Sequence, residues 1–188
     1  MKKLKFIAVG LLLTTLIACG GSSGNQEATA EGFSEIEKEI KSEFGDDAYF
    51  TDLSIIYDKS IGNMVGITVT KDPESLKMGE WNQTQGVWEQ TAEVTLEVPH
   101  GTKAADFMFQ LGDEINLTKL GELIEKSKKQ LQDEKDLKNP TLSIASVIFP
   151  DNGDISKAQY SINLEPENGG TSFYFYYNLD GELDSMDY

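Results

Sequence analysis

The side chains that most often carry enzyme chemistry are scarce in this chain, which has one histidine, His100, and one cysteine, Cys19. A Ser-His-Asp or Cys-His arrangement needs an imidazole beside a nucleophile and an orienting carboxylate. His100 stands between Pro99 and Gly101, a sequence typical of a surface turn. Zinc needs three or four ligands, mostly His and Cys. We therefore expect no catalytic residue of these classes, no metal site and no cofactor.

Carboxylates, by contrast, are abundant, because the 188 residues include 32 Asp and Glu. A glycoside hydrolase needs two of them, about 5–5.5 Å apart for retention or about 6.5–9.5 Å apart for inversion at the sugar. The sequence alone does not identify such a pair. A hydrolase that uses paired carboxylates stays open as an alternative, ranked below a non-catalytic role.

Two acidic segments that contain glycine, residues 151–154 and 180–184, suggest calcium loops. Neither has the spacing of an EF-hand loop with its closing glutamate. Asn-Gly and Asp-Gly between strands favour hairpin turns. We interpret both segments as turns.

The aromatic run at residues 173–177 is the strongest candidate for a binding surface. In a strand, alternate side chains point to opposite faces, so Tyr174 and Tyr176 share the face away from their phenylalanine neighbours. The simpler interpretation is a central strand whose tyrosines form ordinary amphipathic surface. In the functional interpretation, Tyr174 and Tyr176, together with Trp81 or Trp88, form an exposed aromatic platform for a peptide, sugar or protein.

Charge excludes one class of partner. The chain has 16 lysines and no arginine against its 32 acids, a net charge of −16. A body this acidic repels nucleic acid phosphates, so we expect no nucleic acid partner. The only locally basic cluster, within residues 126–138, is interleaved with acids and is typical of a solvated helix face.

The beginning of the chain has the features of an export signal. Lys2, Lys3 and Lys5 precede an apolar run that ends at residue 18, and this run is too short to span a ~30 Å hydrocarbon core as a helix. The sequence Leu16-Ile17-Ala18-Cys19 resembles the lipobox of bacterial lipoproteins. That resemblance implies that residues 1–18 are a cleaved signal peptide. It also implies that Cys19, modified with a thioether lipid and N-acylated with a chain such as palmitate, attaches the protein to the membrane.

Residues 19–32 are rich in glycine, serine and other polar residues, and we interpret them as a flexible tether. The lipobox then places the body in the cell envelope, facing the periplasm or the cell exterior. Two or more acyl chains suffice for stable anchoring.

The rest of the chain alternates helical and strand patterns. Phe33, Ile36, Ile40 and Phe44 form one apolar stripe, which predicts a helix over residues 33–44. A longer helix is predicted over 117–135, with Asn116 or Thr118 as its N-cap. The predicted strands cover residues 49–57, 64–70, 77–83, 91–98, 104–111, 142–149, 155–164, 172–179 and a short segment from 182.

Laid side by side, the two halves repeat one order of elements, residues 33–112 and residues 113–188, and the segment 81–88 corresponds weakly to 177–183. Helix-then-sheet units behind a lipobox resemble the PepSY-like and β-lactamase-inhibitor-protein-like modules of bacterial envelope proteins. This predicts an α+β fold of two α-β-β-β-β repeats, with the helices packed on one face of the sheets.

Together these observations predict a lipid-anchored envelope protein that binds a protein, peptide or glycan partner without catalysis. The alternatives are an envelope hydrolase and a purely structural subunit of an envelope complex.

Overall fold

The computed structural model describes residues 26–188, so the predicted signal peptide and the lipidation site Cys19 lie outside the described residues. Within this range the chain forms two α-helices and one eight-stranded antiparallel sheet. The helices are α1 (Ala30–Phe44) and α2 (Leu117–Lys135). The strands are β1 (Tyr49–Asp58), β2 (Gly62–Thr70), β3 (Lys77–Thr84), β4 (Val87–Thr95), β5 (Pro140–Ile148), β6 (Gln159–Pro166), β7 (Phe173–Asn178) and β8 (Leu183–Asp187).

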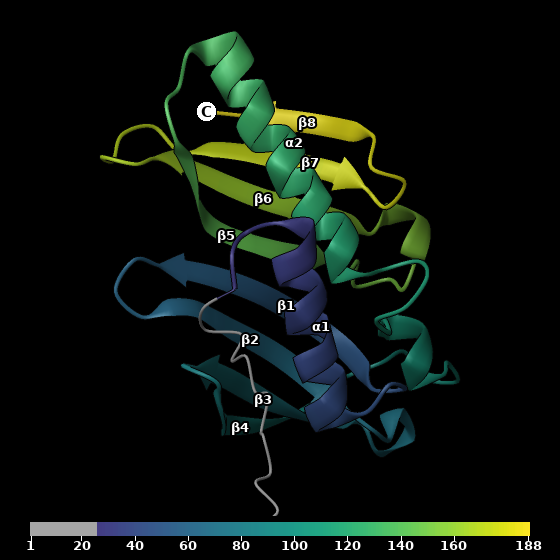
Figure 1. The fold of residues 1–188 in the computed structure, drawn as a ribbon. Coiled ribbons are helices and arrows are strands. Elements are labelled where there is room, and N and C mark those ends of the chain that lie inside the picture. Colours follow the sequence, from purple (N-terminus) through teal and green to yellow (C-terminus); the bar gives the residue numbers. More distant parts are fainter. Residues whose placement is uncertain (1–25) are drawn as a thin grey trace, which may run out of the picture.

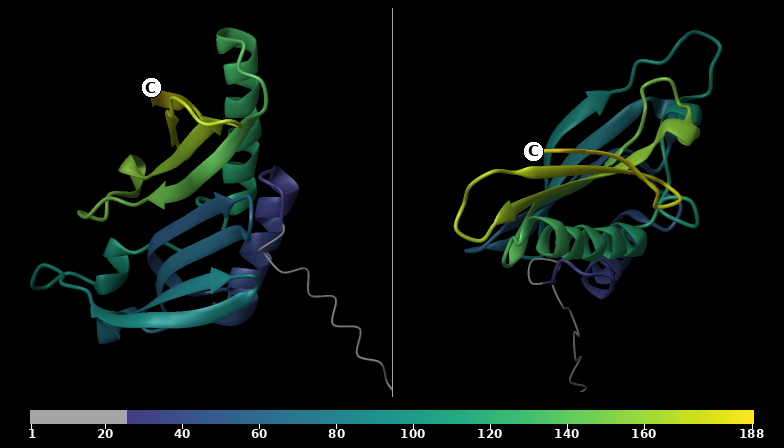
Figure 2. Two further views of the ribbon diagram at one scale, coloured as in Figure 1. Left: turned by 90° about the vertical axis from the view of Figure 1, so that its left-hand side faces the viewer. Right: turned by 90° about the horizontal axis from the view of Figure 1, so that it is seen from above.

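Both α-helices cover the same face of the sheet, as the side view and the view from above in Figure 2 show together with Figure 1. The strand order is β4-β3-β2-β1-β5-β6-β7-β8, so each half of the chain forms a meander of four strands. The two meanders join where β1 pairs with β5 in antiparallel orientation, with Leu53 opposite Val147. The result is one continuous sheet with β4 and β8 at its edges.

Helix α1 forms on the predicted apolar stripe, because Phe33, Ile36 and Ile40 are fully buried. It begins at Ala30, three residues before the predicted start at residue 33. The reason is its cap, since the Thr29 hydroxyl accepts a hydrogen bond from the Gly32 N–H at 3.2 Å. The helix ends at Phe44, and its C-cap is Gly45, whose φ of +98° suits glycine and whose N–H donates to the Lys41 carbonyl. Part of the predicted tether is therefore helical.

Helix α2 has the predicted bounds, Leu117–Lys135. The predicted cap Asn116 is confirmed, because its Oδ1 accepts a hydrogen bond from the Lys119 N–H at 2.8 Å. Gly121 lies where α2 passes the beginning of α1, and a Cβ at Gly121 would lie 2.6 Å from the Ala30 Cα. The two helices therefore touch backbone to backbone at this point.

The main core lies between the helices and the sheet. Alternate residues of β1, among them Leu53 and Ile55, point toward the helices and are buried, as are Ile162 and Phe175 in the second half. The largest side chains of this core that are fully buried are Tyr160, Tyr177, Phe33, Phe50, Phe175, Ile36 and Ile40.

A second, smaller cluster of apolar side chains lies against the other face of the sheet, near the outer strands of the first half. It buries Met78, Ala104 and Met108. Residues 104–111 do not form the predicted strand. The segment Ala104–Phe107 is instead a short 3-10 helix (η3), followed by an isolated antiparallel bridge between Phe109 and Phe50. The segment after β4 therefore folds back over one end of the sheet.

Two other 3-10 helices are present in the described residues, η2 (Pro73–Ser75), which lies between two predicted strands, and η4 (Ile155–Lys157), which falls within one. The predicted strand over 155–164 starts only at Gln159, because the Asp154 carboxylate caps the N–H of Ser156 and holds η4. The predicted pair of α-β-β-β-β repeats is consequently not matched in detail. The connections differ between the halves, since η2 follows β2 and η4 follows β5. The strands also form one sheet, where the prediction had a sheet in each repeat.

Among residues 26–188, neither helix combines the length and apolar composition needed to cross a bilayer.

Candidate functional site

We call the face of the sheet that the α-helices leave uncovered the bare face. The pairing register of the strands arranges its side chains in lines that cross the sheet. In the centre of the sheet, Ile56 of β1 lies opposite Met64 of β2 on one side and Ile144 of β5 on the other. Ile144 in turn pairs with Asn163 of β6, and Asn163 with Tyr174 of β7. These five positions form one line across five neighbouring strands, which we call the apolar row.

A second line runs parallel to the apolar row on the same face, and its side chains are small or hydroxylic. Ser54 of β1 pairs with Gly66 of β2 and with Ser146 of β5. Ser146 pairs with Ser161 of β6, which pairs with Tyr176 of β7. We call this line the serine row. Two adjacent lines, one apolar and one neutral polar, therefore cross the middle of the bare face without a charge.

The charged side chains of the bare face lie outside the centre of these rows, and all of them are acids. Strands β1–β8 place no lysine on this face, since Lys77 shares the opposite face with Gly79 and Glu93. We call the acids of this face the rim acids, and they are Asp52, Asp58, Glu80, Glu89, Glu165 and Asp187. The bare face is thus neutral in its middle and negative around it.

Asn163 is the unusual residue of the apolar row. The residue is only 7% exposed, and among residues 26–188 its buried Oδ1 has no hydrogen-bond partner. A buried amide oxygen that loses its bond to water destabilises the fold by roughly 1–3 kcal/mol. Asn163 stands between Ile144 and Tyr174, where an aliphatic side chain would avoid that penalty.

The structure separates the four predicted platform residues into two groups on opposite faces. Tyr174 is 39% exposed and Tyr176 half-buried, both on the bare face as predicted. Trp81 and Trp88 lie on the helix side, where each ring meets Phe44 of α1 edge-to-face, with centroids 5.4 and 4.9 Å away. The tryptophans therefore pack against the core, and do not extend the surface that the tyrosines form.

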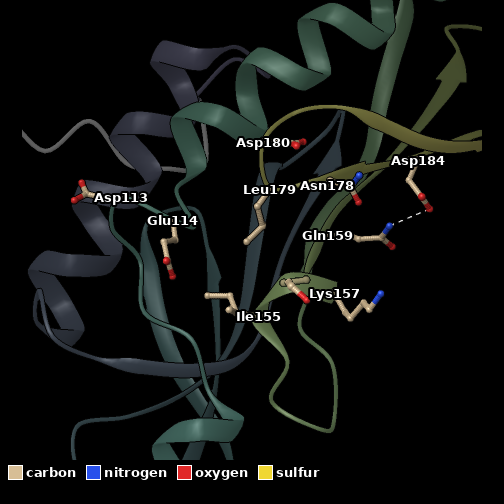
Figure 3. A pocket seen from close by; sticks show the side chains of 11 residues that line it. Asp113, Glu114, Ile155, Lys157, Gln159, Asn178, Leu179, Asp180 and Asp184 are labelled. Atoms are coloured by element: carbon tan, nitrogen blue, oxygen red, sulfur yellow. Dashed lines mark hydrogen bonds between the residues drawn. The ribbon is translucent and has the colours of Figure 1, made fainter.

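A hollow of about 940 Å³ lies at one end of the second meander, and we call it the end hollow. It lies between the segment before α2, the η4 turn and the turn from β7 to β8. Figure 3 shows Glu114, Ile155 and Leu179 directed into it, whereas Lys157 points away. On its far wall the Gln159 amide donates to the Asp184 carboxylate at 3.1 Å.

The carboxylates of the end hollow are accessible to water. Glu114, Asp180 and Asp184 are all exposed. A catalytic acid that stays protonated near neutral pH is usually desolvated by its surroundings, and these groups lack that environment. Within residues 26–188, His, Cys, Asp and Glu side chains do not gather in threes in a way that could hold a metal ion.

The acidic turns and His100 serve as loop residues. The Asp154 carboxylate accepts hydrogen bonds from the N–H and the hydroxyl of Ser156. The hydroxyl bond is the main reason that the pKa of Asp154 lies below its usual value. Asp180 likewise accepts from the Glu182 N–H at 2.8 Å, within the turn between β7 and β8. His100 is exposed, in the turn after β4.

Two lysines of α2, Lys126 and Lys128, contact other parts of the fold. Lys126 donates to the Gly181 carbonyl and lies over the Tyr177 ring, 4.9 Å from its centroid. Lys128 is half-buried, and this desolvation lowers its pKa, although Glu125 and Glu27 act in the opposite direction. The predicted solvated helix face is therefore only partly solvated.

Comparison of the chain with protein-family models, with curated proteins and with solved structures finds no match. The candidate site therefore stands on its own geometry.

The sequence alone did not point to Met64, Ile56, Ile144 or Asn163. A signal for Ile56 was present, because Ile55-Ile56 places apolar residues on both faces of β1, as Val147-Ile148 does on β5. A strand with one wet face alternates between apolar and polar residues, so such pairs indicate a second apolar surface. Asn163 left no such signal.

Proposed function

We propose that this is a lipid-anchored protein of the cell envelope that binds a protein, peptide or glycan partner without catalysis, through its bare face. The observation that carries the proposal is the composition of that face. In a chain with 26% charged residues, the apolar row and the serine row each cross five strands without a charge, and Ile56 and Tyr174 of the apolar row are each 39% exposed. Exposed apolar surface bordered by polar groups is typical of interaction sites.

Site-specific photocrosslinking in cells that express the full chain tests this function. A photoreactive amino acid at Ile144 or Tyr174 should give discrete crosslinked products, because both positions face away from the helices. The control position is Glu43, which is exposed on α1. Products from Glu43 alone, with none from the bare face, would contradict the proposal.

The anchor is supported by the lipobox sequence and needs its own test. Metabolic labelling with a palmitate analogue should label the wild-type chain and not a Cys19→Ala variant. Mass spectrometry of the N-terminal peptide should find Cys19 acylated and residues 1–18 removed. A free thiol at Cys19, or a chain that still begins with Met1 in the cytosol, would overturn this part of the proposal.

We also infer that the body consists of two related α-β-β-β-β units, residues 33–112 and residues 113–188. The strand order, which runs outward from β1 in one half and from β5 in the other, supports this arrangement. The segments 81–88 and 177–183, which correspond weakly in sequence, contain the turns of the outer hairpins β3–β4 and β7–β8. The two units would place their bare faces side by side in one surface.

An envelope hydrolase is the rival proposal, and the end hollow is the feature that favours it. Glu114 is the carboxylate directed into that hollow, so a screen of glycoside and ester substrates with the wild type and Glu114→Gln would decide. Turnover that Glu114→Gln abolishes would favour the hydrolase. A purely structural subunit would give neither turnover nor a bare-face partner outside its own complex.

A further inference from the structure

We propose that the bare face binds an extended peptide whose apolar centre is flanked by lysine or arginine, and that this peptide lies across the strands along the apolar row. The inference rests on the proposed function, because it specifies the partner of the same face. It follows from the length of the row, its chemistry and the charge around it.

The dimensions of the row set the size of the peptide. Met64, Ile56, Ile144, Asn163 and Tyr174 occupy five adjacent strands, and neighbouring strands lie about 4.8 Å apart, so the row is about 19 Å long. An extended chain rises about 3.3 Å per residue, so about six residues span this length. A longer peptide would reach the rim acid Asp187 beyond Tyr174 on β8. At the other end it would pass Thr84 of β3 and Val87 of β4, and Glu89 lies two residues further along β4.

The chemistry of the row favours apolar side chains over a sugar. Met64, Ile56 and Ile144 are consecutive positions that offer no hydrogen-bonding side chain. A glycan laid on them would lose water from its hydroxyl groups without replacement, which is unfavourable. Aliphatic or aromatic side chains of a peptide would instead gain from the same burial.

The charge of the face selects the flanking residues. Asp187 continues the apolar row on β8, and Glu89 lies on β4 at the opposite edge of the serine row. Because strands β1–β8 place no lysine on the bare face, the charges that these strands carry there attract cations and repel anions. A second copy of this chain would bring its own rim acids against these, so the charge disfavours dimerisation through the bare face.

Asn163 gives the row one polar position. Its buried oxygen has no hydrogen-bond partner in the described part of the chain, and the amide lies in the line that the peptide would cover. A polar group that the fold leaves unsatisfied is expected where binding supplies the compensation. An Asn163→Leu variant separates these roles, because it should raise the thermal midpoint of unfolding and weaken peptide binding at the same time.

The test uses the full chain, purified from its membranes in detergent, and three sets of synthetic ten-residue peptides. One set has randomised apolar and aromatic centres flanked by two lysines on each side, the second has the same centres flanked by glutamates, and the third is decalysine. We expect only the lysine-flanked set to bind. Its affinity should fall about tenfold between 50 and 500 mM salt, since the distance over which charges interact becomes shorter as ionic strength rises.

Two pairs of variants locate the binding. Ser146→Lys places a cation in the serine row and should abolish binding, whereas Ser42→Lys on the exposed side of α1 should not. Glu89→Gln combined with Asp187→Asn should weaken binding several-fold. Its matched control is Glu43→Gln combined with Asp46→Asn, at exposed positions away from the bare face.

Each of the other outcomes overturns the inference, and each shows which part of the proposed function still holds. Equal binding of glutamate-flanked peptides, still abolished by Ser146→Lys, would refute the charge argument and keep the bare face. Binding of decalysine alone would show a non-specific acidic surface. All peptides could fail to bind, while the protein binds a glycan array or forms a dimer that Ser146→Lys abolishes. That result would refute the peptide as the partner and keep the bare face as the binding surface. Binding that Ser146→Lys does not affect would refute both.

Discussion

Glu37 of α1 accepts a hydrogen bond from the backbone N–H of Leu117, the first residue of α2, at 2.7 Å. The arrangement is reciprocal, because Glu125 of α2 accepts from the N–H of Ala30, the first residue of α1, at 3.1 Å. Each helix thus supplies a negative charge to the positive end of the other, where it is electrostatically favourable. These contacts connect the two halves of the chain on the side opposite the bare face.

Glu37→Ala should destabilise the protein, because it leaves the N–H of the buried residue Leu117 without an acceptor. The expected loss in the free energy of unfolding is about 1–3 kcal/mol, measured by urea denaturation. Glu37→Gln should lose less, since an amide oxygen can still accept. Glu35→Ala is the matched control, at a half-exposed position whose carboxylate pairs with Lys38, and should change stability by no more than about 0.5 kcal/mol. Equal effects of the two alanine variants would contradict the capping role.

Gly121→Ala tests the close approach of the two helices. The new methyl group would meet the Thr29 carbonyl and lie 2.6 Å from the Ala30 Cα, and these backbone atoms cannot move as a side chain would. Overpacking of this kind typically costs about 1–3 kcal/mol, against a gain in helix propensity of about 1 kcal/mol. We expect a net loss in thermal stability. Gly112→Ala, with open space around the new methyl, should have little effect.

Alkaline solution should destabilise the fold through two buried tyrosines. Burial raises the pKa of Tyr177, although its bond to Ser127 acts in the opposite direction, and burial likewise raises the pKa of Tyr160. The folded state therefore keeps these protons at a pH where the unfolded state loses them. Their contribution is full below the ordinary tyrosine pKa near 10 and disappears as pH rises through the higher, folded value.

Tyr177→Phe isolates this effect, because the Ser127 hydroxyl keeps its bond to the Leu123 carbonyl. Urea unfolding between pH 8 and 11.5 should show a smaller decline for the variant than for the wild type. Lys128 partly offsets the decline in both, since its lowered pKa gives a contribution that is present above its ordinary pKa and lost as pH falls. An unchanged slope in Tyr177→Phe would contradict the assignment to this hydroxyl.

Local patterns predicted the helices well because their signals lie within a few residues of each other. Asn116 and the stripe that follows it define α2 from its first residue to its last. Helix α1 is capped by Thr29. The small residues that follow Thr29 do not extend the apolar stripe, so the stripe predicted a start of α1 that is three residues too late. The η4 turn was mistaken for a strand, because the bond from Ser156 to Asp154 is specific to that turn.

The bare face could not be predicted in the same way, because it depends on pairing between strands far apart in sequence. Ile56 and Ile144 become neighbours only when β1 pairs with β5. Bulges also change which side a residue faces. In β4 the register shift leaves Thr91 as an extra residue between Gln90 and Ala92. Trp88 therefore faces the helices, although simple alternation would place it on the same face as Ala92, the bare face.

The separation of the four aromatic residues leads to a final prediction. Tyr174→Ala combined with Tyr176→Ala should lower the free energy of unfolding by only about 1 kcal/mol, the usual scale of cross-strand contacts at a surface. Trp81→Ala combined with Trp88→Ala should cost at least about 2 kcal/mol, because both rings pack on Phe44 and their removal leaves a cavity.

The same two variants divide stability from binding. If the bare face is the functional surface, the tyrosine variant should lose the partner in the crosslinking experiment while its urea midpoint stays close to that of the wild type. The tryptophan variant should shift the midpoint and, at a temperature where it is still folded, keep the partner. The tyrosine variant could instead unfold at the same urea concentration as the tryptophan variant. Tyr174 and Tyr176 would then stabilise the sheet, because only side chains packed against other parts of the fold lower the free energy of unfolding by that amount when they are removed.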